Sequence, residues 1–168
     1  FTEGRFRPTG LASYARPLGH PDHPKPMPLS VPNAIELSKR TGILLHDDDF
    51  DLTHLLAAAP KNIHAAAYMP SLAGVSPWHV SDTVQGFVDG LRKECLTRYA
   101  DRLPDITDTG TVNEVIAWAK HADVEQIIVP TPTVGPMRSY LDKTTAQLST
   151  EGVRICEIRA PYDTLCWP

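Results

Sequence analysis

The sequence lacks any apolar run long enough to cross a membrane. A transmembrane helix needs about 20 predominantly apolar residues, whereas the apolar stretch at residues 42–45 is followed almost at once by Asp47, Asp48 and Asp49. A strong excess of one charge is missing too, because the formal net charge is −4. We therefore expect a soluble protein with no membrane contact, and nothing in the composition indicates a nucleic-acid-binding surface.

Cysteine is scarce and widely spaced. The three cysteines, Cys95, Cys156 and Cys166, include no C-x-x-C pair, so neither a disulfide framework nor a zinc site is indicated. A reducing, cytoplasmic location fits this usage best. The length of 168 residues, 42% of them apolar, is enough for one hydrophobic core.

Two motifs that carry chemistry in other proteins are missing. There is no G-x-S-x-G nucleophile elbow, and the loop after the apolar segment "EQIIVP" contains a single glycine, Gly135, where a phosphate-binding loop carries several. We therefore expect no catalytic and no metal-binding residues in this chain.

Proline is concentrated at the start of the sequence, where residues 1–32 hold seven of the 16 prolines. Proline cannot occupy the interior of a helix or a central strand. We therefore expect an extended, partly polyproline strap that connects two bodies. The segment "NAIELSKRTG" that follows predicts a short helical turn ended by Gly42. The seven prolines are Pro8, Pro17, Pro21, Pro24, Pro26, Pro28 and Pro32.

From Gly42 onward, short apolar runs alternate with helical periodicity, which is typical of a parallel sheet built from βαβ units. The expected strands are residues 42–46, 62–69, 104–107, 125–130 and 153–159, and the expected helices are residues 81–100, 111–123 and 136–152. Continuous apolar runs at 43–45 and 127–129 indicate central strands that are covered on both faces. The sequence therefore predicts an α/β fold with an open, doubly wound, five-stranded parallel sheet.

The expected helices have recognisable start signals. Asp82 with Gln85, and Thr111 with Glu114, have the spacing of capping boxes, and Pro136 suits a first helical position. The helix at 81–100 places six residues at three- and four-residue spacing, and we expect this face to be buried. These residues are Val84, Phe87, Val88, Leu91, Cys95 and Tyr99.

Ligands of doubly wound sheets bind beyond the carboxyl ends of the strands, where the strand order reverses, and two loops are expected there. The first, "HDDDFDLTH", is either a divalent-metal or acid–base site or a solvated loop in which Asp51 caps the next helix. The missing EF-hand spacing favours the second interpretation. The other loop, "VPTPTVGPMRSY", is either an anion site at a helix start beside Arg138 or an ordinary connection stiffened by prolines.

The order of these elements, from "ILLHDDDFDLTHLL" through "IHAAAYMP" to "EQIIVPTPTVGPMRSYL" and "GVRICEIRAPY", resembles the α/β domain of the DNA photolyase and cryptochrome family over about residues 42–160. The opening "RFRPTGLASY" is similar to the end of that family's helical FAD-binding domain. Phe6, Pro8 and Gly10 match, while Arg7 departs from the usual Asp. The resemblance implies a Rossmann-like sheet in the order 3-2-1-4-5, with the strand at 42–46 beside that at 125–130.

The same resemblance implies a domain plan and a role. Residues 1–41 would be the tail of an FAD-binding domain plus the Pro-rich linker, and residues 42–168 a photolyase-like α/β domain, in the reverse of the usual order. The expected role is a noncatalytic antenna-type or docking domain of a flavoprotein for light-dependent DNA repair or light sensing. FAD and DNA would be bound by the helical partner domain of the parent chain, and an antenna pigment would occupy the interdomain pocket. The expected pocket residues are His46, Asp47, Met69, Pro70, Thr131, Thr133, Met137 and Arg138.

Two alternatives remain. The chain could be a stand-alone nucleotide-binding protein of the universal-stress or electron-transfer-flavoprotein type, although the single glycine of its loop argues against this. It could also be a purely structural docking surface, which predicts an exposed apolar patch.

Overall fold

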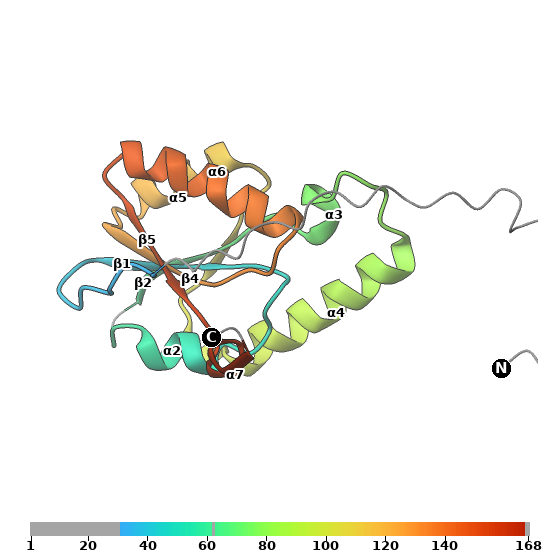
Figure 1. Cartoon of the computed structure of the whole chain (residues 1–168), viewed down its shortest axis with the longest axis horizontal. Helices are drawn as coiled ribbons and strands as arrows, with labels where there is room; N and C mark the ends of the chain where they lie inside the picture. Colours follow the sequence, from blue (N-terminus) through green and yellow to red (C-terminus); the bar gives the residue numbers. More distant parts are fainter. Residues whose placement is uncertain (1–30, 62, 167–168) are drawn as a thin grey trace, which may run out of the picture. The chain divides into compact units, whose positions relative to one another are not determined.

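Five strands form one parallel sheet in the order β3-β2-β1-β4-β5 in the computed structural model (Figure 1). This confirms the α/β fold class and the 3-2-1-4-5 order expected from the sequence. The structure describes residues 31–61 and 63–166, so most of the expected Pro-rich strap lies outside the described residues. The strands are β1 (Thr41–Leu45), β2 (Ile63–Tyr68), β3 (Ile106–Asp108), β4 (Gln126–Pro130) and β5 (Arg154–Ile158).

The two central strands, β1 and β4, are buried along their whole lengths. Consecutive side chains of a strand point to opposite faces, so Leu44 and Ile127 pack in one core cluster while Ile43, Leu45 and Ile128 pack in the other. Helices cover both faces, and each central position therefore needs an apolar residue. This explains the continuous apolar runs.

The helices divide between the two faces of the sheet, with α5 and α6 on one face and α2 and α4 on the other (Figure 1). Two short helices, α3 and α7, follow β2 and β5 and have no counterpart among the sequence-based predictions. The helices are α2 (Thr53–Ala58), α3 (Leu72–Val75), α4 (Asp82–Arg98), α5 (Val112–His121), α6 (Pro136–Thr150) and α7 (Pro161–Cys166), with a 3₁₀ turn at Ala100–Arg102.

The helix starts agree only in part with the expected capping boxes. Thr111 caps α5, and its side chain accepts a hydrogen bond from the amide of Glu114, as predicted. The Glu114 carboxylate, however, accepts the amide of Gly110 at 2.6 Å, so only half of the expected box is present. The expected box of Asp82 and Gln85 is wrong, because Ser81 is the N-cap of α4 and its Oγ accepts the Val84 amide at 3.4 Å. The cap therefore begins one residue earlier than the sequence pattern indicated.

The apolar face expected for α4 is buried only in its second half. Cys95 and Tyr99 are buried, whereas Val84 is 46% exposed and Phe87 is 66% exposed. The first half of α4 extends beyond the sheet (Figure 1). Its apolar residues form part of the molecular surface.

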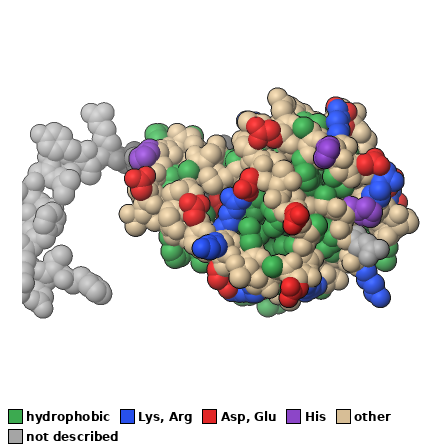
Figure 2. Space-filling model, turned by 180° about the vertical axis from the view of Figure 1, so that it is seen from behind, with side chains coloured by type: hydrophobic (Ala, Val, Ile, Leu, Met, Phe, Trp, Pro, Cys, Tyr) green, Lys and Arg blue, Asp and Glu red, His purple; other side chains and the backbone are tan. Residues whose placement is uncertain are grey.

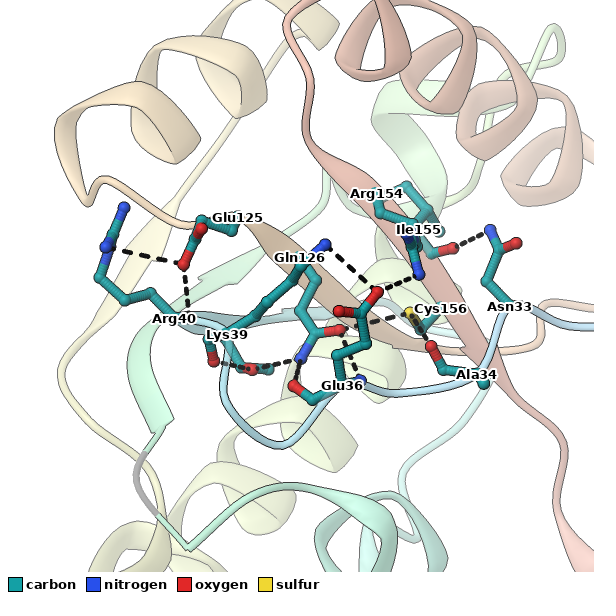
Figure 3. Close-up of polar contacts among 11 residues, drawn as sticks. Asn33, Ala34, Glu36, Lys39, Arg40, Glu125, Gln126, Arg154, Ile155 and Cys156 are labelled. Carbon is teal, nitrogen blue, oxygen red and sulfur yellow. Dashed lines mark hydrogen bonds and ion pairs between the residues drawn. The ribbon is translucent and has the colours of Figure 1, made fainter.

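The segment before β1 is fastened to the sheet and is not helical. Residues 37–39 form a turn, and Gly42 lies inside β1 instead of ending a helix. A Cβ atom at Gly42 would lie 2.9 Å from the Trp118 ring, so only glycine lets α5 pack this close. Upstream, the buried Gln126 side chain bonds both the amide (3.1 Å) and the carbonyl (2.7 Å) of Glu36 (Figure 3). The boundary expected at residue 42 thus falls within a segment bonded to β4.

Within residues 31–61 and 63–166, no helix combines the length and apolar character that a membrane span requires. The three cysteines carry free thiols. Cys95 and Cys156 are buried and Cys166 is exposed.

Candidate functional site

A buried histidine joins the two loops that were expected to meet where the strand order reverses. His46 follows β1, is fully buried, and its Nε2 lies 2.8 Å from the carbonyl oxygen of Pro130 at the end of β4. Its Nδ1 accepts a hydrogen bond from the Asp48 amide at 3.2 Å, so Nε2 carries the proton and donates to Pro130. Burial lowers the pKa of His46, and the ring stays neutral. His46 therefore positions the loop and is shielded from any ligand.

A second contact joins the β1–α2 loop to the β4–α6 loop at the carboxyl edge of the sheet. Asp48 Oδ2 accepts hydrogen bonds from the amide of Thr133 at 3.1 Å and from its hydroxyl at 2.9 Å. The two partners come from the β1–α2 and β4–α6 loops, which confirms that parallel strands β1 and β4 bring both loops to one edge. The carboxylate is thereby engaged with protein donors.

A chain of polar contacts extends from this rim toward β3. The Tyr68 hydroxyl donates to Asp47 at 3.0 Å, and the Arg92 guanidinium lies 3.9 Å from the centre of the Tyr68 ring. Arg92 of α4 also forms an ion pair with Asp108 at the end of β3. Burial and the Asp47 charge raise the pKa of Tyr68, so the phenol remains protonated.

A cavity of about 350 Å³ lies beside these polar contacts, at the carboxyl ends of β2 and β3. Its size falls within the range of small-molecule sites. Its walls combine apolar, small and charged residues, and Arg92 is a cation with stacking capacity. The lining residues are Met69, Pro70, Ser71, Gly74, Arg92, Asp108, Thr109 and Gly110. Two of the expected pocket residues, Met69 and Pro70, belong to this lining, and their role in binding stays a prediction.

The expected pocket residues of the β4–α6 loop have other contacts. Met137 is buried in the core. Arg138 donates to Asp142 at 2.6 Å and to Glu157 at 2.7 Å, so two carboxylates neutralise its charge. Thr131 donates its amide to Ile158 at 2.9 Å, while its buried hydroxyl has no hydrogen-bond partner among the described residues. The role of these residues in a pocket stays a prediction.

The acidic loop after β1 is engaged in contacts within the protein. Asp51 Oδ1 accepts the Thr53 amide at 3.0 Å and the Tyr99 hydroxyl at 2.9 Å. The side chain and amide of Thr53, followed by the Tyr99 hydroxyl, lower the pKa of Asp51. Asp49 lies 3.5 Å from His54, and burial raises the pKa of Asp49. Among the described residues no group of three His, Cys, Asp or Glu side chains is placed to hold a metal ion. These contacts favour the structural interpretation of the loop.

Sequence reasoning missed Tyr68, Arg92 and Asp108. Tyr68 belongs to an apolar strand, and Arg92 stands among the charged residues of a surface helix. Their proximity depends on the pairing of β2 with β3, which aligns Tyr68 with Asp108. Only the predicted order of the strands, which places β2 beside β3, could have indicated that these residues lie close together.

Large apolar side chains are exposed around the carboxyl edge. Trp78, in the connection between α3 and α4, is 81% exposed, and Val134 in the β4–α6 loop is fully exposed. Together with Val84 and Phe87 at the start of α4, they follow the carboxyl ends of β2 and β4. Exposed apolar side chains that gather at one edge are a feature of interaction surfaces.

The fold and this edge define a Rossmann-like α/β protein of the doubly wound class. No family model matches the sequence, and no curated protein matches it.

Proposed function

We propose that this chain is a noncatalytic accessory α/β domain of a photolyase- or cryptochrome-like flavoprotein. Its carboxyl edge would dock on the FAD-binding helical domain of the same parent chain. The observation that carries the proposal is the exposure of Trp78, Phe87 and Val134 at the edge where doubly wound sheets bind their partners and ligands. Residues 42–160 and the opening "RFRPTG" resemble that family, and this resemblance is the reason for proposing an FAD-binding domain as the docking partner.

The cavity above β2 and β3 supports an antenna role for the same edge. A planar pigment needs an apolar wall, a stacking partner and a fixed orientation, and it needs no catalytic acid or base. Met69 and Pro70 supply apolar surface, and Arg92 is held in place by Tyr68 and Asp108. Such a pocket would orient a chromophore toward the docked flavin domain.

Association with the flavin domain tests the docking role. The variant Trp78→Ser/Phe87→Ser should weaken binding to the FAD-binding domain encoded with this chain at least tenfold, because buried aromatic residues dominate interface energies. Leu37→Ser is the matched control, since Leu37 is also exposed (74%) but precedes β1 at the opposite edge. Equal binding by both variants, or a parent gene that encodes no flavin domain, would reject the proposal.

The alternative of a stand-alone nucleotide-binding protein makes a different prediction. Such a protein would bind ATP or AMP at the β4–α6 loop, where Gly135 has a positive φ of 154° and the α6 amides begin. Calorimetric titration with ATP and AMP distinguishes the two. Micromolar binding, together with amide chemical-shift changes at residues 131–138, would favour the alternative.

A further inference from the structure

A second cavity lies at the opposite edge of the sheet, where the strands begin. It has a volume of about 500 Å³ and is formed by the turn before β1 and the loop before β2. Because these strands are parallel, both segments lie at the amino edge. The lining residues are Leu37, Ser38, Lys39, Arg40, Pro60, Lys61 and His64.

The charged lining of this cavity has one sign. Lys39, Arg40, Lys61 and His64 contribute nitrogen donors, and no acidic residue belongs to the lining. This contrasts with the formal net charge of −4 for the chain. Figure 2 shows Lys, Arg and His side chains, with Asp and Glu side chains between them, on the right of that view, the side of the molecule on which the amino edge lies.

Two of the cations are placed by neighbouring acids. Lys39 Nζ lies 3.2 Å from Glu36. Arg40 donates its Nε to the Asp123 carbonyl at 2.7 Å and pairs with the carboxylates of Asp123 at 3.3 Å and Glu125 at 3.6 Å. These contacts and the Gln126 bonds to Glu36 fix the turn at the cavity wall (Figure 3).

The other two basic side chains of the lining, Lys61 and His64, have no partner among the described residues. Lys61 and His64 are exposed, and among the described residues neither makes an ion pair or a side-chain hydrogen bond. Their donors remain available to a ligand at the mouth of the cavity. The wall therefore combines two cations that are paired with carboxylates and two side chains, Lys61 and His64, whose nitrogen atoms are available to a ligand.

We propose that this amino-edge cavity binds a phosphate-bearing ligand of nucleotide size. Lysine and arginine are the usual partners of phosphate oxygens, because they combine positive charge with several N–H donors. A volume of about 500 Å³ admits a ligand larger than the phosphate group alone. Leu37 and Pro60 supply apolar surface for the remainder of that ligand. The site is independent of the carboxyl edge and of the proposed docking role.

The test is a titration of the isotope-labelled chain with inorganic phosphate, AMP and a short oligothymidylate at low ionic strength, followed by amide chemical shifts. We expect amide shifts at residues 37–40 and at residues 61 and 64. Lys61→Ala should weaken binding about tenfold, the loss expected for one charge-assisted hydrogen bond, and Lys61→Glu should abolish it. Lys143, an exposed lysine of α6, provides the matched controls Lys143→Ala and Lys143→Glu, which should bind like the parent chain. The same spectra verify that each variant is folded.

The three ligands distinguish the source of the phosphate. Equal affinity for inorganic phosphate and AMP indicates recognition of the phosphate alone, and tighter AMP binding indicates a nucleotide. Tighter, strongly salt-dependent binding of the oligonucleotide indicates a nucleic-acid strand. The proposal is overturned if no ligand shifts the amino-edge amides, or if Lys61→Glu binds as tightly as Lys143→Glu. Shifts confined to residues 131–138 would also overturn it, while favouring the nucleotide-binding alternative for the other edge.

Discussion

His46 Nε2 donates a hydrogen bond of 2.8 Å to the Pro130 carbonyl oxygen, and this bond links the ends of the two central strands. Pro130 lies at the end of β4, where the chain leaves the sheet for the β4–α6 loop. The histidine ties this carbonyl to the β1–α2 loop, and Asp48 repeats the link through Thr133. The rim of the sheet is thereby a fixed platform.

The neutral state of His46 predicts a pH dependence of stability. Burial lowers its pKa below the ordinary value of 6.5, so the unfolded chain binds more protons than the folded chain just below that pH. The free energy of unfolding should therefore fall as the pH drops from about 7 to about 5.5, by at most about 1.4 kcal/mol per pH unit from this group. Urea denaturation of the parent chain and of His46→Asn measures the difference.

For His46→Asn, the free energy of unfolding should depend less steeply on pH, because this variant lacks the titrating imidazole ring. The charges around the ring are Asp47, Asp48 and Asp49. Asp49 acts in the opposite sense, since its raised pKa favours the folded state as the pH falls. Identical slopes for the parent and His46→Asn would show that His46 is not held neutral.

Gln126→Leu should release the segment before β1. The Gln126 amide pairs with both backbone groups of Glu36 and with Thr41 Oγ1 at 2.7 Å. Its loss leaves partly buried polar groups without partners, which costs about 2 kcal/mol or more in the free energy of unfolding. The Glu36 amide should also lose protection from hydrogen exchange. Gln147→Leu, on the exposed side of α6, should change neither quantity by more than about 0.5 kcal/mol.

Two glycine-to-alanine substitutions should have opposite effects. Gly42→Ala places a methyl group 2.9 Å from the Trp118 ring and 3.3 Å from Val124, and overpacking should lower the free energy of unfolding by about 1–3 kcal/mol. Gly86→Ala lies in α4 with no atom within 4 Å of the new methyl group, and should raise it by about 0.5–1 kcal/mol. Thermal or urea denaturation measures both. A stabilising Gly42→Ala would contradict the close packing of α5 on β1.

The sheet could be predicted because its central strands are constrained on both faces. Residues 43–45 and 127–129 have no polar side chain, and such runs are typical of parallel strands that are covered on both faces. Periodicity along α4 was equally clear, yet it identifies an apolar face without saying whether anything covers that face. Val84 and Phe87 are exposed for this reason.

The polar contacts of the site were beyond the reach of the sequence. Gln126 is the polar first residue of an otherwise apolar strand, and its partner Glu36 lies 90 positions away in the sequence. Arg92 meets Tyr68 and Asp108 only because β2 and β3 are neighbours. Such pairs depend on strand order and side-chain rotamers, which no local pattern encodes.

The most direct test of the accessory-domain proposal is amide hydrogen exchange on this chain, alone and joined to the FAD-binding domain of its parent. The proposal predicts slower exchange at residues 77–91 and 131–138, because docking would cover the exposed face of α4 and the β4–α6 loop. Residues 60–64 at the amino edge should exchange equally in both samples. Unchanged exchange at residues 77–91, or protection confined to the amino edge, would contradict the proposed docking surface.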